Sequence, residues 1–211
     1  MWKVVISGVG GQGVITAGIL LAEAAVIHEG RYGVQSQSYG AEMRGGLSRA
    51  DVIISDSEII YPKVEQAHLL VCLHAKALGA YAGVIRPGGI LITDADQAPI
   101  DRRIDCRQFA LALVATAREA TGSERNVNVC VLGAVVAITG IVAPEALRAA
   151  VRERFGGSEA GAKAAASADA RAAGALDALE AGYELGKEHA PKLHLQGDSR
   201  EAGRHATSAR L

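Results

Sequence analysis

A glycine-rich turn near the start of the chain has the residue types that bind phosphate. Its candidate binding residues are Gly8, Gly10, Gly11, Gln12 and Gly13. The turn follows the apolar run 4–6 and precedes a segment, 14–28, that is predicted to be a helix. Glycines between a strand and a helix let main-chain N–H groups approach a phosphate, and the helix start adds a partial positive charge. The Gln12 amide could both donate and accept hydrogen bonds there.

Three interpretations of this turn stay open: a purely structural turn, a phosphate-binding turn and a dinucleotide fingerprint. The last requires an acidic residue about 20 positions further on, at the end of the second strand, to hold the ribose hydroxyls. The second predicted strand instead ends in Gln35-Ser36-Gln37-Ser38, and the next acid, Glu42, lies in a glycine-rich loop. The missing acid counts against an ordinary nicotinamide-dinucleotide site.

That loop is the second candidate binding segment. Its candidate contact residues are Ser38, Tyr39 and Arg44, and its glycines permit close backbone approach. The planar guanidinium of Arg44 suits a phosphate or a carboxylate, and Tyr39 could stack on a ring or pack on a partner protein. The alternative is a hairpin turn in which Arg44 and Glu42 form a solvated pair.

Other polar residues at strand ends are expected to be structural. His74 follows the apolar run 69–73, and Asp94 and Asp96 follow another, 90–93, at the ends where open α/β sheets place ligands. We expect His74 to be an ordinary strand-end residue and the aspartates to cap the next segment. The sequence has no recognisable nucleophile–base or paired-carboxylate pattern, so no catalytic residue is predicted.

The remaining charged and thiol side chains are expected to be structural as well. Arg49 and Asp51 are predicted to be a simple exposed pair on a strand. Cys72, Cys106 and Cys130 are widely spaced and form no Cys-x-x-Cys pair, which argues against a zinc site or an iron–sulfur cluster made by this chain alone. An odd number of cysteines without secretion features indicates reduced thiols and a cytoplasmic protein.

Strands and helices alternate in the first half of the chain. The predicted strands after the first are 32–38, 47–55, 69–73 and 90–94, with helices at 14–28 and 75–83 and a turn at 86–89. The short connection between 32–38 and 47–55 predicts an antiparallel hairpin.

The second half is predicted to be mostly helical. The expected helices are 109–120, 129–141, 143–155 and 158–189. The whole is an α/β fold: one domain over 1–189, with a mostly parallel sheet and a helical C-terminal extension. Residues 190–211 are polar and aperiodic, which predicts a mobile tail.

Composition excludes some classes of partner. The 211 residues carry a formal net charge of −1, so there is no electrostatic case for nucleic acid or for an anionic membrane surface. No apolar run approaches the roughly 18 residues that span a bilayer, so no membrane insertion is expected. Hydrophobic residues make up 49% of the chain and aromatic ones 4%, which predicts a core of Ala, Val, Ile and Leu.

The two glycine-rich segments together resemble a known family. The chain from Gly8 to Val14, the later run from Gln37 to Gly46, and Ser48 with the strand 52–55 are similar to the gamma subunit of the 2-oxoacid:ferredoxin (acceptor) oxidoreductases. The resemblance covers about residues 2–185. It implies a Rossmann-like domain that works beside alpha, beta and delta-type subunits, which carry thiamine diphosphate, magnesium and iron–sulfur clusters.

The resemblance also implies a function. Such enzymes oxidatively decarboxylate a 2-oxo acid, form an acyl-coenzyme A and pass electrons to ferredoxin or another acceptor. The gamma subunit is implicated in coenzyme A binding, which the turn and the loop would perform side by side. A similar turn occurs in the indolepyruvate oxidoreductase beta subunit, and the chain does not specify which 2-oxo acid is used. A free-standing NAD(P)-binding oxidoreductase and a nucleotide-sensing module are the alternatives.

Overall fold

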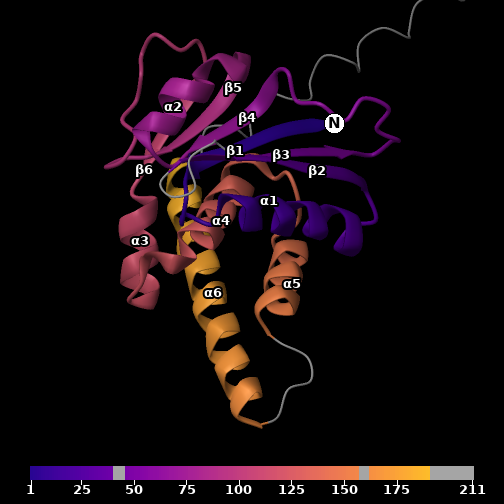
Figure 1. Ribbon diagram of the computed structural model, residues 1–211, viewed down its shortest axis with the longest axis vertical. Helices are drawn as coiled ribbons and strands as arrows, with labels where there is room; N and C mark the ends of the chain where they lie inside the picture. Colours follow the sequence, from indigo (N-terminus) through magenta and orange to yellow (C-terminus); the bar gives the residue numbers. More distant parts are fainter. Residues whose placement is uncertain (40–45, 157–161, 191–211) are drawn as a thin grey trace, which may run out of the picture.

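The computed structural model describes residues 1–39, 46–156 and 162–190, and these form one mixed sheet with helices on both faces (Figure 1). The strands are β1 (Trp2–Val9), β2 (Tyr32–Tyr39), β3 (Leu47–Ser55), β4 (Ala67–Cys72), β5 (Ile85–Asp94) and β6 (Arg107–Leu111). Their order across the sheet is β2-β3-β1-β4-β5-β6. Strands β1, β4, β5 and β6 are parallel, whereas β3 is antiparallel to both of its neighbours. The predicted mostly parallel sheet and its hairpin are therefore confirmed.

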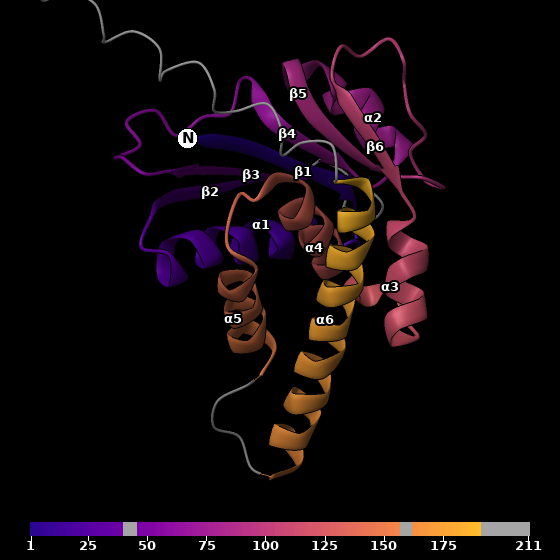
Figure 2. The same cartoon turned by 180° about the vertical axis from the view of Figure 1, so that it is seen from behind.

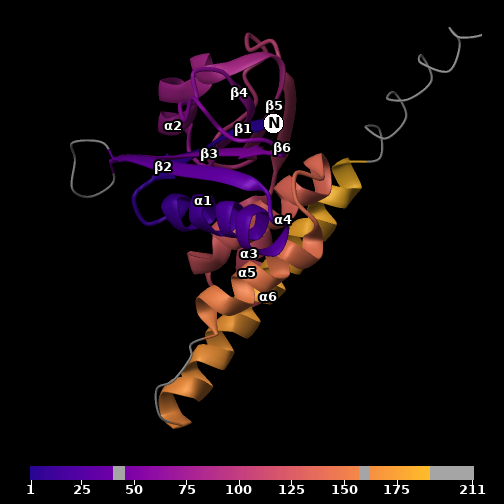
Figure 3. The same ribbon diagram turned by 90° about the vertical axis from the view of Figure 1, so that its right-hand side faces the viewer.

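The helices lie unequally on the two faces (Figure 2). They are α1 (Val14–Glu23, extended by a π-helical turn to His28), α2 (Ala75–Tyr81), α3 (Leu113–Thr121), α4 (Val127–Thr139), α5 (Pro144–Phe155) and α6 (Ala162–His189). One face of the sheet packs on α1 and on the helices of the second half, and the other carries α2 (Figure 3). Successive side chains of β1 point to opposite faces of the sheet and so contribute to both cores. Val4 and Ile6 belong to the larger core and Val5 to the smaller one.

Helices α4 and α6 approach each other closely through glycines. A Cβ on Gly182 would collide with the carbonyl group of Cys130, and a Cβ on Gly133 would collide with the carbonyl oxygen of Leu179. Helix α4 is buried on nearly every side, which explains why its sequence is apolar throughout rather than striped. The predicted C-terminal helical extension therefore packs into the same core as the sheet.

Two local predictions were wrong. Residues 86–89 are not a connecting turn but a bulge inside β5, where the pairing jumps from Ala67–Ile85 to Leu69–Ile90 and Gly88 takes a φ of 70°. The segment 109–120 is not one helix, because its first residues belong to the edge strand β6. Of the predicted tail, all but residue 190 lies outside the described residues.

Asp94 explains where the chain changes from β6 to α3. This buried carboxylate accepts hydrogen bonds from the main-chain N–H groups of Asp96 (3.1 Å) and Gln97 (3.0 Å) through Oδ1, and from that of Val114 (2.9 Å) through Oδ2. It therefore caps the turn after its own strand and the start of α3, which confirms the predicted capping role of this residue.

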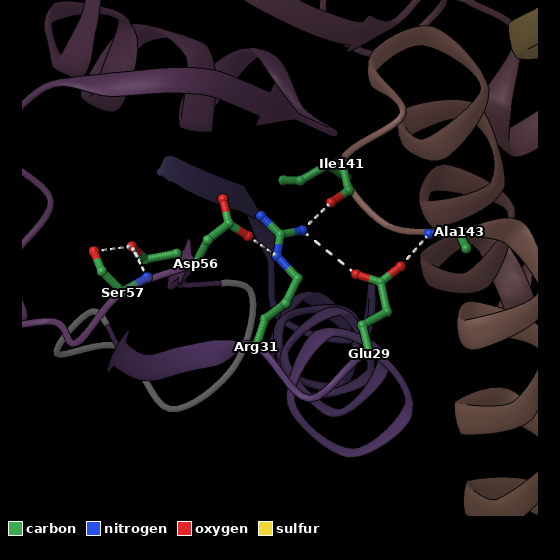
Figure 4. A network of polar contacts seen from close by, with 7 residues as sticks. Glu29, Arg31, Asp56, Ser57, Ile141 and Ala143 are labelled. Atoms are coloured by element: carbon green, nitrogen blue, oxygen red, sulfur yellow. Dashed lines mark hydrogen bonds and ion pairs between the residues drawn. The ribbon is translucent and has the colours of Figure 1, made fainter.

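Arg31 links three segments of the chain at the end of the sheet opposite the glycine turn (Figure 4). Its guanidinium donates to the Ile141 carbonyl oxygen and to Asp56, both at 2.8 Å, and pairs with Glu29 at 3.4 Å. Glu29 in turn accepts from the Ala143 N–H group. The end of the α1 segment, the end of β3 and the α4–α5 connection are thereby tied together.

Replacing Gly182 with alanine should destabilise the protein. The new methyl group would overlap the α4 backbone, and overpacking of this kind costs about 1–3 kcal/mol. Gly174→Ala in the same helix is the control: its Cβ would meet only the Asn126 amide, at 3.5 Å, so we expect a gain of about 0.5–1 kcal/mol. Urea unfolding followed by circular dichroism measures both, and equal stability of the two variants would contradict the close crossing.

Asp94→Asn should also lower the free energy of unfolding. An amide cannot accept all three hydrogen bonds, and its NH2 group would face a main-chain donor, at a cost of about 1–3 kcal/mol. Asp96→Asn, at an exposed neighbour, should change stability by less than about 0.5 kcal/mol. Thermal melts of the two variants compare these costs; a stability of D94N within error of that of D96N would show that the capping bonds contribute nothing.

Candidate functional site

The glycine turn lies at a position in the sheet where α/β proteins bind ligands. The chain leaves the carboxyl end of β1 through this turn and α1 toward β2 on one side, while the parallel strand β4 lies on the other side. A crevice outside the strand ends forms at such a reversal of direction. Gly11 (φ 98°) and Gly13 (φ 68°) occupy left-handed conformations that a residue with a Cβ adopts only with strain. Their glycine identity is therefore required by the turn itself.

The start of α1 presents main-chain donors that have no partner among the residues that the structure describes. Within the turn, the Gly10 N–H group donates to the Gly46 carbonyl oxygen at 3.0 Å. The N–H groups of Gly13, Val14 and Ile15 donate to no other residue that the structure describes. No side chain caps this helix, and its first turn holds no acidic residue. Free donors and the positive end of the helix dipole favour an anion at this point.

Gln12 holds the turn in place. Its Oε1 accepts from the Val9 N–H group at 2.8 Å, and its Nε2 donates to the Leu73 carbonyl oxygen at 3.1 Å. The amide thus links the end of β1 to the end of β4. Gly8 leaves the room for it, because a Cβ at Gly8 would collide with Oε1. The hydrogen bonding predicted for Gln12 is real, but both observed partners are main-chain groups of this chain.

The second candidate loop begins and ends beside the turn. Strand pairing places Ser48 between Gly8 and Tyr39, and the bond from Gly10 to Gly46 joins the far end of the loop to the turn. Ser38 is exposed at the end of the edge strand β2. The predicted residue Arg44 and the Tyr39 side chain lie outside what the structure describes. The backbone therefore brings the glycine turn and the two described ends of the loop to one edge of the sheet.

Strand β3 also explains why the acid of a dinucleotide site is missing. In a dinucleotide fold the strand after the first helix lies beside β1 and supplies that acid. Here β3 pairs with β1 along its whole length and separates it from β2. The end of β2 is thus one strand further from the glycine turn.

Two further residues have structural roles. His74 accepts from the Lys76 N–H group through Nδ1 at 3.1 Å and so caps α2, in line with its expected strand-end role. Arg49 and Asp51 are not an exposed pair: their side chains are 17% and 19% exposed, and two hydrogen bonds of 2.6 and 2.9 Å join them. The prediction failed because the chain after β3 folds back over this face, where Arg49 also donates to the Val64 carbonyl oxygen and lies over the Tyr81 ring.

Asn128 is a candidate that the sequence reasoning missed. It is only 5% exposed, in the first turn of α4, and its amide lies against Gly13. It forms no hydrogen bond with any residue that the structure describes. A lone asparagine in the apolar run 127–138 was the available signal.

Thiol chemistry and metal binding find no support among the described residues. Burial raises the pKa of Cys72 and of Cys130 to about 12, which keeps both thiols protonated, and burial also raises the pKa of the half-buried Cys106. The described part of the chain holds no group of three or more His, Cys, Asp or Glu residues that could bind a metal ion. None of its helices is both long and apolar enough to cross a bilayer.

Comparison with known proteins agrees with this architecture. Residues 3–184 match the family model described as pyruvate ferredoxin/flavodoxin oxidoreductase. The 2-oxoglutarate synthase subunit KorC of Methanothermobacter thermautotrophicus is 44% identical over 154 residues, which cover 70% of this chain and 82% of that protein. The common gamma subunit of the pyruvate/ketoisovalerate oxidoreductases of Thermococcus kodakarensis is 34% identical, over 76% of this chain and 91% of the relative.

Solved structures show the same fold. The gamma subunit of a keto/oxoacid ferredoxin oxidoreductase from Geobacter sulfurreducens superposes with a TM-score of 0.70 at 34% identity, covering 88% of this chain and 98% of that one. The 2-oxoglutarate:ferredoxin oxidoreductase of Magnetococcus marinus, solved with 2-oxoglutarate, coenzyme A and succinyl-CoA, has a TM-score of 0.75 at 21% identity over 89% of this chain and 31% of that one. The chain belongs to the pyruvate ferredoxin/flavodoxin oxidoreductase family and is of its gamma-subunit type.

Proposed function

We propose that this gamma-type chain contributes coenzyme A binding to an assembled 2-oxo acid oxidoreductase. The enzyme would cleave the bond between the carboxylate and the carbonyl carbon of a 2-oxo acid and release CO2. It would join the acyl group to the coenzyme A thiol and pass two electrons to ferredoxin or another acceptor. Alpha, beta and delta-type subunits would carry thiamine diphosphate, magnesium and the iron–sulfur clusters, and no catalytic residue would come from this chain.

The proposal rests on one observation: the N–H groups at the start of α1 donate to no residue in the described part of the chain. Coenzyme A has a diphosphate and a 3′-phosphate, and a helix start without acidic residues suits such anions. Arg44 would add a positive charge from the neighbouring loop, and Tyr39 would pack on the ligand or on a partner subunit. Ser38 and Gln12 would be hydrogen-bonding groups, Gln12 through the second N–H bond of Nε2, since the first is donated to the Leu73 carbonyl oxygen. The turn and both ends of the loop lie at one edge of the sheet, as this division of tasks requires.

The two alternatives from the sequence lack comparable support. A free-standing NAD-dependent enzyme would need an acid, and an NADP-dependent one a basic residue, on the strand that follows the first helix and lies beside β1; β3 occupies that place. A nucleotide-sensing module would work alone. Native purification separates the three: the proposal expects a brown complex with thiamine diphosphate, whereas an isolated chain that turns over a substrate would exclude it.

Arg44→Ala should raise the KM of the assembled enzyme for coenzyme A about tenfold or more, because a hydrogen-bonded charge pair is worth at least about 1.4 kcal/mol. We expect kcat and subunit assembly to be unchanged. Arg86→Ala removes an equal charge from the exposed bulge of β5 and should leave the KM as it is. Normal kinetics of R44A in a complex that dissociates would instead make the loop an interface element.

Gly11→Ala tests the turn itself. Its methyl group would occupy the space through which a phosphate approaches, so we expect a tenfold higher KM for coenzyme A. Gly30→Ala is matched in backbone strain, since Gly30 also has a positive φ (67°) and open space around its Cβ position. Both variants should lose about 1–2 kcal/mol of stability, but only G11A should change the KM. An equal KM in both would mean that the turn does not contact coenzyme A.

A further inference from the structure

We propose that the side-chain amide of Asn128 is a further ligand-binding group, which donates a hydrogen bond to a phosphate oxygen held at the start of α1. This inference rests on the proposed function, because it concerns the same anion site. It adds a residue from the second half of the chain, more than 100 positions from the glycine turn.

Gly13 and Asn128 are fitted to each other. A Cβ on Gly13 would lie 2.8 Å from both Cγ and Nδ2 of Asn128, closer than such atoms approach. Glycine at this position therefore serves two purposes: it permits the φ of 68° that starts α1, and it lets the amide lie directly against the helix start. The asparagine is thereby placed beside the same N–H groups that donate to none of the described residues.

The Asn128 amide is available for a further partner. The residue is only 5% exposed, and its amide forms no hydrogen bond with any residue that the structure describes. A hydrogen bond to a ligand at this position would contribute about 0.5–1.5 kcal/mol. The neighbours of Asn128 along α4 are valines, a cysteine and a leucine, so the helix itself has no use for a polar residue here. The half-buried Gln12 amide, by contrast, is held by two main-chain groups. A phosphate oxygen at the start of α1 would satisfy the Asn128 amide.

The chemistry of the site favours a phosphate ester. Main-chain N–H groups and an amide NH2 are hydrogen-bond donors, and no acidic side chain lies in the first turn of α1 or of α4. Several donors converging from two elements suit a tetrahedral anion with several oxygens. The diphosphate of coenzyme A is such a group.

The experiment measures binding of inorganic pyrophosphate to the full chain by isothermal titration calorimetry. Asn128→Asp keeps the shape and adds a negative charge, and an acid is tolerated in a first helical turn. Asn128→Leu removes the donor without a charge and serves as the second variant if N128D does not fold. Asn126→Asp is the control, because it makes the same change two residues away. Circular dichroism verifies the fold of each.

We expect N128D to raise the Kd for pyrophosphate at least about tenfold and N128L about fivefold. The Kd of N126D should stay within about twofold of the wild-type value. Unchanged binding by folded N128D or N128L, or no binding by the unchanged chain at millimolar pyrophosphate, would overturn the inference.

The KM of the assembled enzyme for coenzyme A separates this inference from the proposed function. If pyrophosphate binding depends on Asn128 while substitutions at Gly11 and Asn128 leave the KM unchanged, the anion site stands and the coenzyme A proposal fails. If the KM responds to Gly11 but not to Asn128, the coenzyme A proposal stands and the role of Asn128 is refuted.

Discussion

The antiparallel pairing of β3 with β1 is the constraint on which the candidate site depends. Because β3 runs back along β1, the loop that leads into it must begin and end beside the turn that leaves β1. The same pairing moves β2 to the edge of the sheet and removes the place where a dinucleotide fold keeps its acid. One hairpin thus places both described ends of the glycine-rich loop beside the glycine turn, and it leaves no place beside β1 for the acid of an NAD site.

Most polar side chains around the strand ends serve the fold. Gln12 links β1 to β4, His74 caps α2, and Asp94 organises the start of α3. Among the residues that the structure describes, the groups left over are main-chain donors at the start of α1 and the amide of Asn128. These described groups suit an anion and are not groups that transfer a proton or attack a carbon. That agrees with a subunit whose companions perform the chemistry.

What could be predicted from the sequence was local. The strand–turn–helix order around Gly13, the hairpin, the start of α5 at Pro144 and the capping by Asp94 follow from short-range patterns of glycine, proline and apolar residues. Features that depend on distant partners were missed. The bulge at 86–89 needs the register with β4, the burial of Arg49 needs the chain near Val64, and the position of Asn128 needs the contact of α4 with Gly13.

Hydrogen exchange of the assembled enzyme, with and without coenzyme A, tests the central claim most directly. Amide hydrogens that bind a phosphate exchange more slowly, so peptides that cover 9–16 should become protected when coenzyme A is present. Peptides from the Arg31 network at the opposite end of the sheet should not change. Protection elsewhere in the complex, with no change in 9–16, would contradict the account.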